Sequence, residues 1–429
     1  MKRLCERKNQ KSQLKKILAL LALKINTMKF SNNHKKITAF LFLISFGMMN
    51  AQENITYEQA LEKAFQQNGI LKNSKLISEY QEKLKASYLD IPQTEVTAQI
   101  GQINGMETDN SFSISQRFSF PTVYTKRKQM LDAEWNASII NQKLTKSQLT
   151  KEVSDVFYRI LTLQEKKKVI EYISKLYSSF ADKASLRLKK GEANILEEST
   201  AEIQREQANM QLSMLDNDLN ITKLQLQVLL QSDSPYQPVS DQPTMNINLQ
   251  VSEEIIKQHP ELQYLNQQIK VNEAEAQLEK SKLLPDLLMG YTNQSMKNLD
   301  NNRFNAVQIG VGIPLFTKGQ RALAKATKAK VAISENEYQR KEIELKNRFG
   351  QQINNYTNQL KIVENYEQKQ LPKSETILKT VQKQLEVGEI DYLNWVILTN
   401  QAVKTKVDYI DNLERLNQIA AELNFLLSK

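Results

Sequence analysis

Side chains that commonly carry out chemistry are scarce in this chain, and they are scarcer still after residue 51. The 429 residues include one cysteine, Cys5, and two histidines, of which only His259 lies beyond residue 51. A zinc or copper site needs several Cys or His ligands, so one subunit cannot assemble one after that point. Thiol chemistry is excluded there, and a His-dependent triad would depend on His259 alone.

His259 stands directly before Pro260, a position that is typical of a residue that opens a helix rather than of a catalytic base. The sequence contains no P-loop and no glycine-rich nucleotide fingerprint. Its acidic pairs fall on stretches that we expect to be exposed helix. We therefore predict no enzyme activity, no cofactor and no metal site.

The strongest pattern in the chain is an internal repeat. The segment Leu188–Leu196, with sequence LKKGEANIL, returns 197 residues later as Leu385–Leu393, with sequence LEVGEIDYL. Three further landmarks recur at offsets of 191 to 193 residues: Asn68 with His259, Pro92 with Pro285, and Pro121 with Pro314. Repeats of this kind indicate a duplicated structural unit, which reads here as helix, strand, strand, long helix and helix.

The repeat divides the chain. We expect residues 1–51 to be a leader, 52–234 the first repeat, 235–250 a linker and 251–429 the second repeat. The linker contains Pro235, Pro238 and Pro243, which favour loop structure.

The positive charge of the protein belongs to the leader. The formal net charge is +10, from 58 basic and 48 acidic residues, but residues 1–51 hold 11 of the basic residues and only Glu6 of the acidic ones. The remainder is neutral, which argues against nucleic acid as a partner. A basic start after Met28, an apolar run over 37–49 and a small residue at Ala51 predict a secretory signal peptide that begins at Met28. The alternative is that this apolar segment is an anchor helix at the membrane interface. If the signal peptide begins at Met28, residues 1–27 would come from an incorrectly assigned upstream start of translation.

Two segments are too long and too regular for a small globular core. No Gly or Pro occurs between Pro121 and Gly191, and apolar residues there recur mostly every three or four positions. At 1.5 Å per residue this predicts a helix of roughly 100 Å, with a coiled-coil seam. Gly191 is expected to turn the chain into a second helix. In the second repeat we expect Gly350 and Pro372 to kink the corresponding helix.

Four stretches alternate with the period of a strand. They are 94–104 and 111–120 in the first repeat, and the stretches around 287–292 and 306–313 in the second. Strands of about ten residues with one apolar face suit a membrane barrel, although a half-buried hairpin on a soluble protein alternates in the same way. The predicted signal peptide favours the barrel. The candidate lipid-facing residues are Phe112, Ile114, Phe118, Phe120, Val307, Ile309 and Val311.

A barrel would require more than one chain. Every backbone amide in lipid must be paired, so the sheet must close, and the smallest membrane barrels have about 8 strands. Four strands per chain are too few. Three copies would supply 12, with the polar faces around a water-filled bore.

With these features the chain resembles the TolC family of outer-membrane efflux channels over nearly all of its length after residue 51. The resemblance is carried by the repeated order of elements, by the Gly-Glu turns at 191–192 and 388–389, and by the strand exits Phe120–Pro121 and Ile313–Gln320 (IPLFTKGQ). The stretches Ser115–Tyr124 (SQRFSFPTVY) and Gly388–Leu393 (GEIDYL) look most like the branch that serves heavy-metal cation pumps.

The resemblance implies a mainly α fold with a small β part. A homotrimer would form a 12-stranded barrel in outer-membrane lipid and a long α-helical barrel in the periplasm of a Gram-negative bacterium. Such a channel is passive. It docks a periplasmic adaptor (membrane fusion) protein and an inner-membrane pump of the resistance-nodulation-division type, which supplies the energy and most of the substrate choice.

The resemblance also implies that the adaptor docks at the turns between the long helices. Small residues let another backbone approach, and leucines supply apolar contact. The alternative is that the glycines only turn the chain and the leucines only pack the coiled coil. The docking candidates are Leu188, Gly191, Leu196, Leu385, Gly388 and Leu393.

A ring of acids at the channel entrance is a weaker expectation. In several family members, aspartates six and nine residues after the second-repeat glycine form this ring, but here those positions are Asn394 and Ile397. Acids near a narrow mouth would favour cations. A solvated helix face explains the same acids and is the favoured interpretation. The candidates are Glu192, Glu197, Glu389 and Asp391.

The sequence therefore predicts a passive efflux channel, with heavy-metal cations as the expected cargo. Multidrug export or export of a secreted product remains an alternative within the same fold. A soluble periplasmic coiled-coil or adaptor protein is a second alternative, although it would not explain two matched hairpins.

Overall fold

The computed structural model describes residues 53–192, 194–245, 247, 253–297 and 302–428, and the chain divides into two units, residues 1–53 and 54–429. The predicted signal peptide lies outside the described residues. Within the second unit the fold is mainly helical with a small β part, as the sequence predicts. Among the described helices, none is long and apolar enough to cross a membrane.

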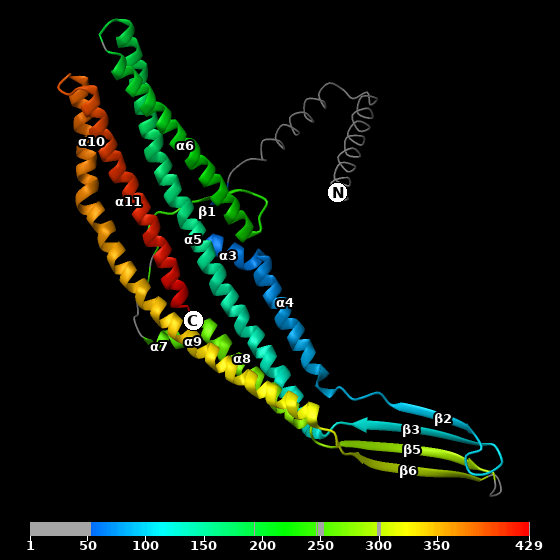
Figure 1. The fold of residues 1–429 in the computed structure, drawn as a ribbon. Coiled ribbons are helices and arrows are strands. Elements are labelled where there is room, and N and C mark those ends of the chain that lie inside the picture. The colour runs from blue at the N-terminus through cyan, green and yellow to red at the C-terminus, as the bar shows by residue number, and fades with distance from the viewer. Residues whose placement is uncertain (1–52, 193, 246, 248–252, 298–301, 429) are drawn as a thin grey trace, which may run out of the picture. The chain divides into compact units, whose positions relative to one another are not determined.

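The elements follow one another in the predicted order in each half of the chain (Figure 1). In the first half they are α3 (Tyr57–Gln67), α4 (Gly69–Leu84), the 3₁₀ turn η1 (Lys85–Leu89), β2 (Glu95–Gly101), β3 (Asp109–Phe118), α5 (Pro121–Lys189) and α6 (Ile195–Leu230). In the second half they are α7 (Glu253–Lys257), α8 (Pro260–Ser281), β5 (Asp286–Met296), β6 (Asn302–Gly312), α9 (Lys318–Asn365), a π-helical turn (Tyr366–Gln370), α10 (Leu371–Glu386) and α11 (Tyr392–Leu426).

The short opening helices begin at matched caps. Asn68 precedes α4, and its side chain accepts hydrogen bonds from the amides of Ile70 and Leu71. His259 precedes α8, and its Nδ1 accepts from the amide of Glu261 at 3.3 Å. Each cap satisfies amides that have no partner within the first turn of a helix.

Helix α5 runs without a break for 69 residues, as the absence of internal Gly and Pro predicts. It carries a buried face throughout its length, with Val153, Phe157 and Ile160 fully buried. Helix α6 packs back along it after the turn at Gly191 (Figure 1).

The corresponding segment of the second half is interrupted once. Helix α9 continues through Gly350, so the helix is not unwound at that residue as the sequence led us to expect. A single helical Gly costs only about 1 kcal/mol, which 48 residues of helix absorb. The break lies instead at the π-helical turn that precedes Pro372. Proline removes an amide donor and crowds the carbonyl four residues earlier, which is the physical reason for local unwinding there.

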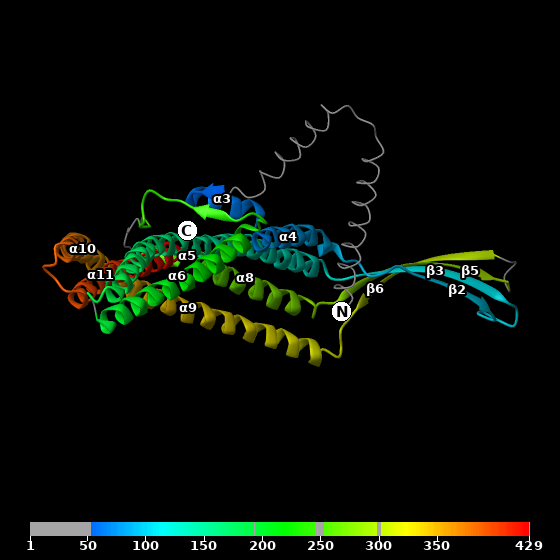
Figure 2. The same cartoon turned by 90° about the horizontal axis from the view of Figure 1, so that it is seen from above.

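The strands form one antiparallel sheet in the order β2-β3-β5-β6, at the end of the molecule from which α5 and α9 begin (Figures 1 and 2). The strand bounds differ slightly from the prediction. Strand β2 ends at Gly101 and β3 already begins at Asp109, so the first hairpin loop spans residues 102–108 rather than 105–110, and β5 continues to Met296. Residues 298–301 of the second hairpin loop lie outside the described residues.

The expected linker contains a short strand of its own. Strand β4 (Tyr236–Pro238) pairs with β1 (Glu53–Ile55), and the amide of Val239 donates to the carbonyl of Ile55 at 3.0 Å. Tyr236 is buried against the core. The linker is therefore tied to the start of the first repeat.

Most of the buried apolar residues fall in three clusters along the helices. The waist cluster joins α3, α5, α6 and α11, and it includes Phe157, Ile160, Leu226, Leu230 and Ala420. The tip cluster joins α5, α6, α10 and α11 near the helix turns, and it includes Ile173, Tyr177, Ala181, Val381, Tyr392 and Trp395. The third, nearer the sheet, includes Leu262, Leu345, Phe349 and Leu423.

Candidate functional site

The two turns between long helices have the same backbone geometry. Gly191 has φ of +76° and Gly388 has φ of +77°, in the left-handed region that glycine adopts without steric cost. In each turn the amide of the next residue, Glu192 or Glu389, donates to the carbonyl five residues earlier at 2.9 Å. This Schellman pattern satisfies the carbonyls at the end of the helix. Both glycines are therefore required by the turn itself, whatever else they do.

The helices that leave the two turns are capped in the same way. The side chain of Asn194 accepts from the amide of Glu197 at 2.9 Å, and that of Asp391 accepts from the amide of Asn394 at 2.9 Å. The duplication detected in the sequence thus extends to individual hydrogen bonds. The two turns present the same backbone structure from two different hairpins.

The four candidate docking leucines divide into two pairs. Leu196 and Leu393, which follow the glycines, are 68% and 52% exposed. Leu188 and Leu385, which precede them, are half-buried, and Leu385 packs against the tip cluster. In the single chain, only Leu196 and Leu393 leave most of their apolar surface exposed and so accessible to a partner protein.

The structure adds exposed apolar residues near the turns that were not among the docking candidates. All of them are more than half exposed, and two of them, Ile195 and Val387, lie within the repeated segments. They are Leu186, Ile195, Val387 and Ile397. Together with Leu196 and Leu393 they give each turn an exposed apolar surface.

Two of the four candidate entrance acids have local structural roles. Glu197 lies 2.7 Å from the guanidinium of Arg187 and is mostly covered. Asp391 is the cap of α11, and the hydrogen bond from the amide of Asn394 lowers the pKa of its carboxyl. Glu192 and Glu389 are exposed. Helix capping and ion pairing therefore account for half of this set.

The sheet has one mostly apolar face and one mostly polar face. Val96, Ile114, Tyr291 and Val307 lie opposite one another across all four strands. The adjacent row contains Thr97, Ser113, Thr292 and Ala306. Neighbouring residues of a strand point to opposite faces of the sheet. The apolar row and the polar row therefore lie on opposite faces, and each row contains residues from both hairpins.

The candidate lipid-facing residues mostly fall on the apolar face. Phe112, Ile114, Val307, Ile309 and Val311 are exposed by 39–77%. Phe118 shares the face but is half-buried. Phe120 was expected in the strand, but β3 ends at Phe118 and Phe120 is the residue before α5. The helix that starts at Pro121 accounts for this difference.

The two helical hairpins meet through an aromatic stack and a polar bridge. The rings of Phe180 and Tyr392 stack at 3.9 Å, and Tyr177 meets Trp395 edge to face at 5.8 Å. The hydroxyl of Tyr177 donates to Asn400 at 2.6 Å. Helices α5 and α11 therefore hold the hairpins together near the turns. Residues 177 and 395 are too distant in sequence for the repeat motif to indicate this contact.

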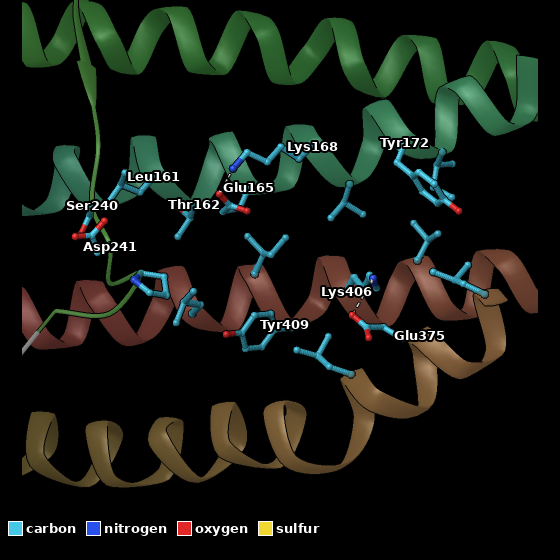
Figure 3. Close-up of a pocket in the computed structure, with 18 residues that line it drawn as sticks. Leu161, Thr162, Glu165, Lys168, Tyr172, Ser240, Asp241, Glu375, Lys406 and Tyr409 are labelled. Carbon is cyan, nitrogen blue, oxygen red and sulfur yellow. Dashed lines mark hydrogen bonds and ion pairs between the residues drawn. The ribbon is translucent and has the colours of Figure 1, made fainter. Parts of the chain in front are cut away.

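A cavity of about 630 Å³ opens between α5, α10 and α11 beside the linker (Figure 3). Its wall includes apolar residues such as Leu161, and its rim carries charges that pair with one another. The ammonium of Lys168 lies 2.5 Å from Glu165, and that of Lys406 lies 3.7 Å from Glu375. These two lysines are neutralised by their carboxylate partners, and Asp241 of the linker also lines the cavity.

His259 has a structural role. It is fully buried, caps α8 and packs edge to face on Phe425 at 5.0 Å. Burial lowers the pKa of its imidazole, which keeps the ring neutral near pH 7. Among the described residues, no group of three or more Cys, His, Asp or Glu could hold a metal ion.

Comparison with known proteins supports the likeness found in the sequence. Residues 251–429 match the family model described as outer membrane efflux protein. No curated protein matches the chain.

Several solved channel structures share the fold. CusC superposes with a TM-score of 0.72 at 15% identity, covering 89% of this chain and 95% of its own. The Campylobacter jejuni CmeC outer membrane channel gives 0.74 at 11% identity, with 87% and 85% covered. The open state of the Neisseria gonorrhoeae MtrE outer membrane channel gives 0.71 at 13% identity, with 87% and 88% covered. At such identities these likenesses show the fold, which extends well beyond the residues that the family model matches.

Proposed function

We propose that this protein, whose residues 251–429 match the outer membrane efflux protein family, is the passive exit channel of a tripartite efflux assembly. The family match and the shared channel fold support an outer-membrane channel that extends into the periplasm rather than an enzyme. The finer steps below concern its assembly, its partners and its cargo.

The observation that carries the proposal is the single four-stranded sheet with a mostly apolar face. Within the described chain its edges are β2 and β6, one from each repeat. An open edge in lipid leaves backbone amides unpaired, which costs several kcal/mol per group. Three copies would join β6 of one chain to β2 of the next and close a wall of 12 strands.

The helix turns are the proposed docking surface for the periplasmic adaptor. Each turn offers exposed apolar residues next to a glycine that leaves open space around its Cα. Apolar anchors of this kind account for most of the energy in helix-to-helix docking. The inner-membrane pump, of the resistance-nodulation-division type, would supply the energy through that adaptor.

Heavy-metal cations are the proposed cargo. The support is the likeness of Ser115–Tyr124 and Gly388–Leu393 to the metal-efflux branch, together with the exposed acids Glu192 and Glu389 beside the turns. Because a passive channel takes most of its selectivity from its pump, drugs or a secreted product fit the same structure.

Deletion of the gene tests the assignment. Growth of the deletion strain is measured across zinc, cobalt, cadmium, copper and silver, and across a panel of amphiphilic drugs. We expect sensitisation to one or two metals that the cloned gene reverses. Sensitisation to many drugs alone would replace metal efflux by multidrug export, and no change in either panel would contradict both.

Docking is tested by introducing a large charged side chain at a turn. Gly388→Glu should keep the amount of trimer in the membrane and abolish complementation, because the charge lies on the docking surface. Gly350→Glu is the matched control, since this glycine is exposed within α9 and is also surrounded by open space. Gly388→Ala introduces the backbone strain of a non-glycine residue without a large charged side chain, so it separates the effect of strain from the effect of side-chain size and charge. Normal complementation by Gly388→Glu would discard the docking surface.

A further inference from the structure

The first turns of α9 carry a basic stripe that forms no ion pair with any acidic residue that the structure describes. Residues 318–334 contain five basic residues and no acidic one. Four of them, Lys318, Arg321, Lys325 and Lys328, are exposed and follow one another in steps of three, four and three residues. This spacing places them on one face of the helix. We call these four residues the basic stripe.

The acids nearest to this part of α9 already have other partners. On the adjacent helix α8, Glu275 pairs with Lys330 at 2.8 Å. Glu279 pairs with Lys282 at 2.6 Å and accepts a hydrogen bond from Gln320 at 2.8 Å. No residue of the basic stripe forms an ion pair with another described residue. The stripe is therefore an unneutralised surface within one chain.

Local helix energetics give no reason for these cations. The amino end of a helix is its positive end, so cations in the first turns oppose the helix dipole. Helix α9 has no acidic residue in its first turn and no side-chain cap at Thr317. A bound anion would offset the unfavourable interaction between these cations and the helix dipole.

The matched helix of the first repeat differs in this respect. Helix α5 also leaves the sheet with three basic residues, but each has a partner in the chain. Lys126 donates to Gln277 at 2.6 Å, Arg127 pairs with Asp90 at 3.1 Å, and Lys128 lies over the ring of Tyr88 at 5.5 Å. The unpartnered stripe is thus a property of α9 and not of every helix that follows a strand.

An exposed apolar segment stands directly before the stripe. Ile313, Leu315 and Phe316 join β6 to α9 and are 66%, 78% and 101% exposed. Ile313 continues the alternation of Val307, Ile309 and Val311 on the apolar face of the sheet. Apolar anchors followed at once by cations are the arrangement that suits the boundary between hydrocarbon and headgroups.

We propose that the basic stripe of α9 binds the phosphate groups of anionic phospholipids, with Ile313, Leu315 and Phe316 inserted beside their acyl chains. The inference rests on the proposed placement of the sheet in the outer membrane. It adds a lipid site on the periplasmic side of that sheet and assigns it to the second repeat. The site would fix the depth and tilt at which α9 leaves the membrane.

The test measures lipid binding by the purified full-length trimer in detergent. Dihexanoyl-phosphatidylglycerol and dihexanoyl-phosphatidylcholine are titrated separately, and bound lipid is counted by native mass spectrometry. We expect the wild type to prefer the anionic lipid, and a variant with Lys318→Gln, Arg321→Gln, Lys325→Gln and Lys328→Gln to lose that preference by roughly tenfold or more. High salt should weaken the preference in the wild type, because exposed charges are screened.

A matched control removes the same charge elsewhere. Lys361, Lys369, Lys373 and Lys379 are exposed on α9, the π-helical turn and α10, and their Gln variants should bind lipid as the wild type does. Equal binding by the stripe variant would overturn the proposal. So would displacement of the lipid by inorganic phosphate alone, which would indicate a free-anion site.

A third result would also overturn the proposal. If the stripe variant dissociates into single chains in a sample to which no lipid has been added, the stripe forms a contact between subunits. Failure of lipid binding in an intact, exporting trimer would leave the proposed channel function in place. Absence of a trimer in the wild type would instead contradict the channel itself.

Discussion

The long helical segments of the two repeats have the same length and different construction. In the first repeat α5 is one helix of 69 residues, whereas the second covers the same distance with pieces of 48, 5 and 16 residues. The first is a continuous spine. The second can change direction at the π-helical turn before Pro372. Duplication has therefore preserved the span while allowing only one copy to bend.

Burial separates the two segments further. Helix α5 contributes fully buried residues such as Phe157 and Ile160 to the waist cluster. In α9, the large aliphatic residues Ile333 and Ile343 are 60% and 62% exposed. Helix α5 therefore packs largely into the core of its own chain. The α9 segment keeps surface available for contacts outside it.

The strongest expected difference between the segments lies in core truncations. Ile160→Ala should lower the free energy of unfolding by about 2–5 kcal/mol, because it empties a fully buried site. Ile343→Ala should change it by no more than about 0.5 kcal/mol in the dissociated chain, because that side chain is exposed. Denaturant unfolding measures both. A similar decrease in the free energy of unfolding for the two variants would contradict the proposed difference in burial between α5 and α9.

The bend itself is tested by Pro372→Ala. The change restores an amide donor, so residues 366–370 should convert to α-helix and their amides should exchange more slowly. The net effect on stability should stay within about 1 kcal/mol, since the regained hydrogen bond and the greater freedom of the unfolded chain oppose each other. Hydrogen exchange followed by mass spectrometry reads out the turn. An unchanged exchange pattern would show that Pro372 does not cause the π-helical turn.

The smallest expected difference concerns the two matched caps, Asn68 and His259. Burial lowers the pKa of His259 in the folded chain, and the charge of Arg348 lowers it further, whereas the charges of Glu261 and Glu422 oppose this decrease. The unfolded chain takes up a proton below about pH 6.5 while the folded chain resists, so stability is full above that pH and falls as the pH decreases towards the folded pKa.

The variant His259→Asn copies the first-repeat cap and should remove this part of the pH dependence while keeping the helix start. Asn68→Ala is the comparison at the other cap, and it should lower stability equally at pH 5 and pH 8. Thermal unfolding at the two pH values provides the measurement. A pH slope that survives His259→Asn would assign the dependence to other groups.

The sequence predicted the long elements well because their causes are local. A stretch without Gly or Pro predicted α5, and the Gly-Glu motif predicted both turns between the long helices. Gly350 misled because a glycine only weakens a helix, whereas a proline removes a donor and adds a steric conflict. The alternation also extended the second strand of the first repeat to Phe120, since periodicity does not reveal where Pro121 starts a helix.

Contacts between distant segments were not predictable from the motifs. The stack of Phe180 on Tyr392 and the bridge from Tyr177 to Asn400 join residues about 200 positions apart, so no spacing rule indicates them. The division of the docking leucines into exposed and half-buried pairs depends on the same contacts. The basic stripe of α9 was visible as a run without acids, but the neutral total charge after residue 51 concealed it.

The central claim is that three copies close one wall, and the mass of the detergent-solubilised particle tests it most directly. Membranes that contain the protein are extracted with and without detergent, and the extracted particle is weighed by light scattering with a correction for bound detergent. The proposal predicts extraction only with detergent and a particle of three chains. A single chain that extracts into buffer alone would contradict it and would favour a soluble periplasmic coiled-coil protein.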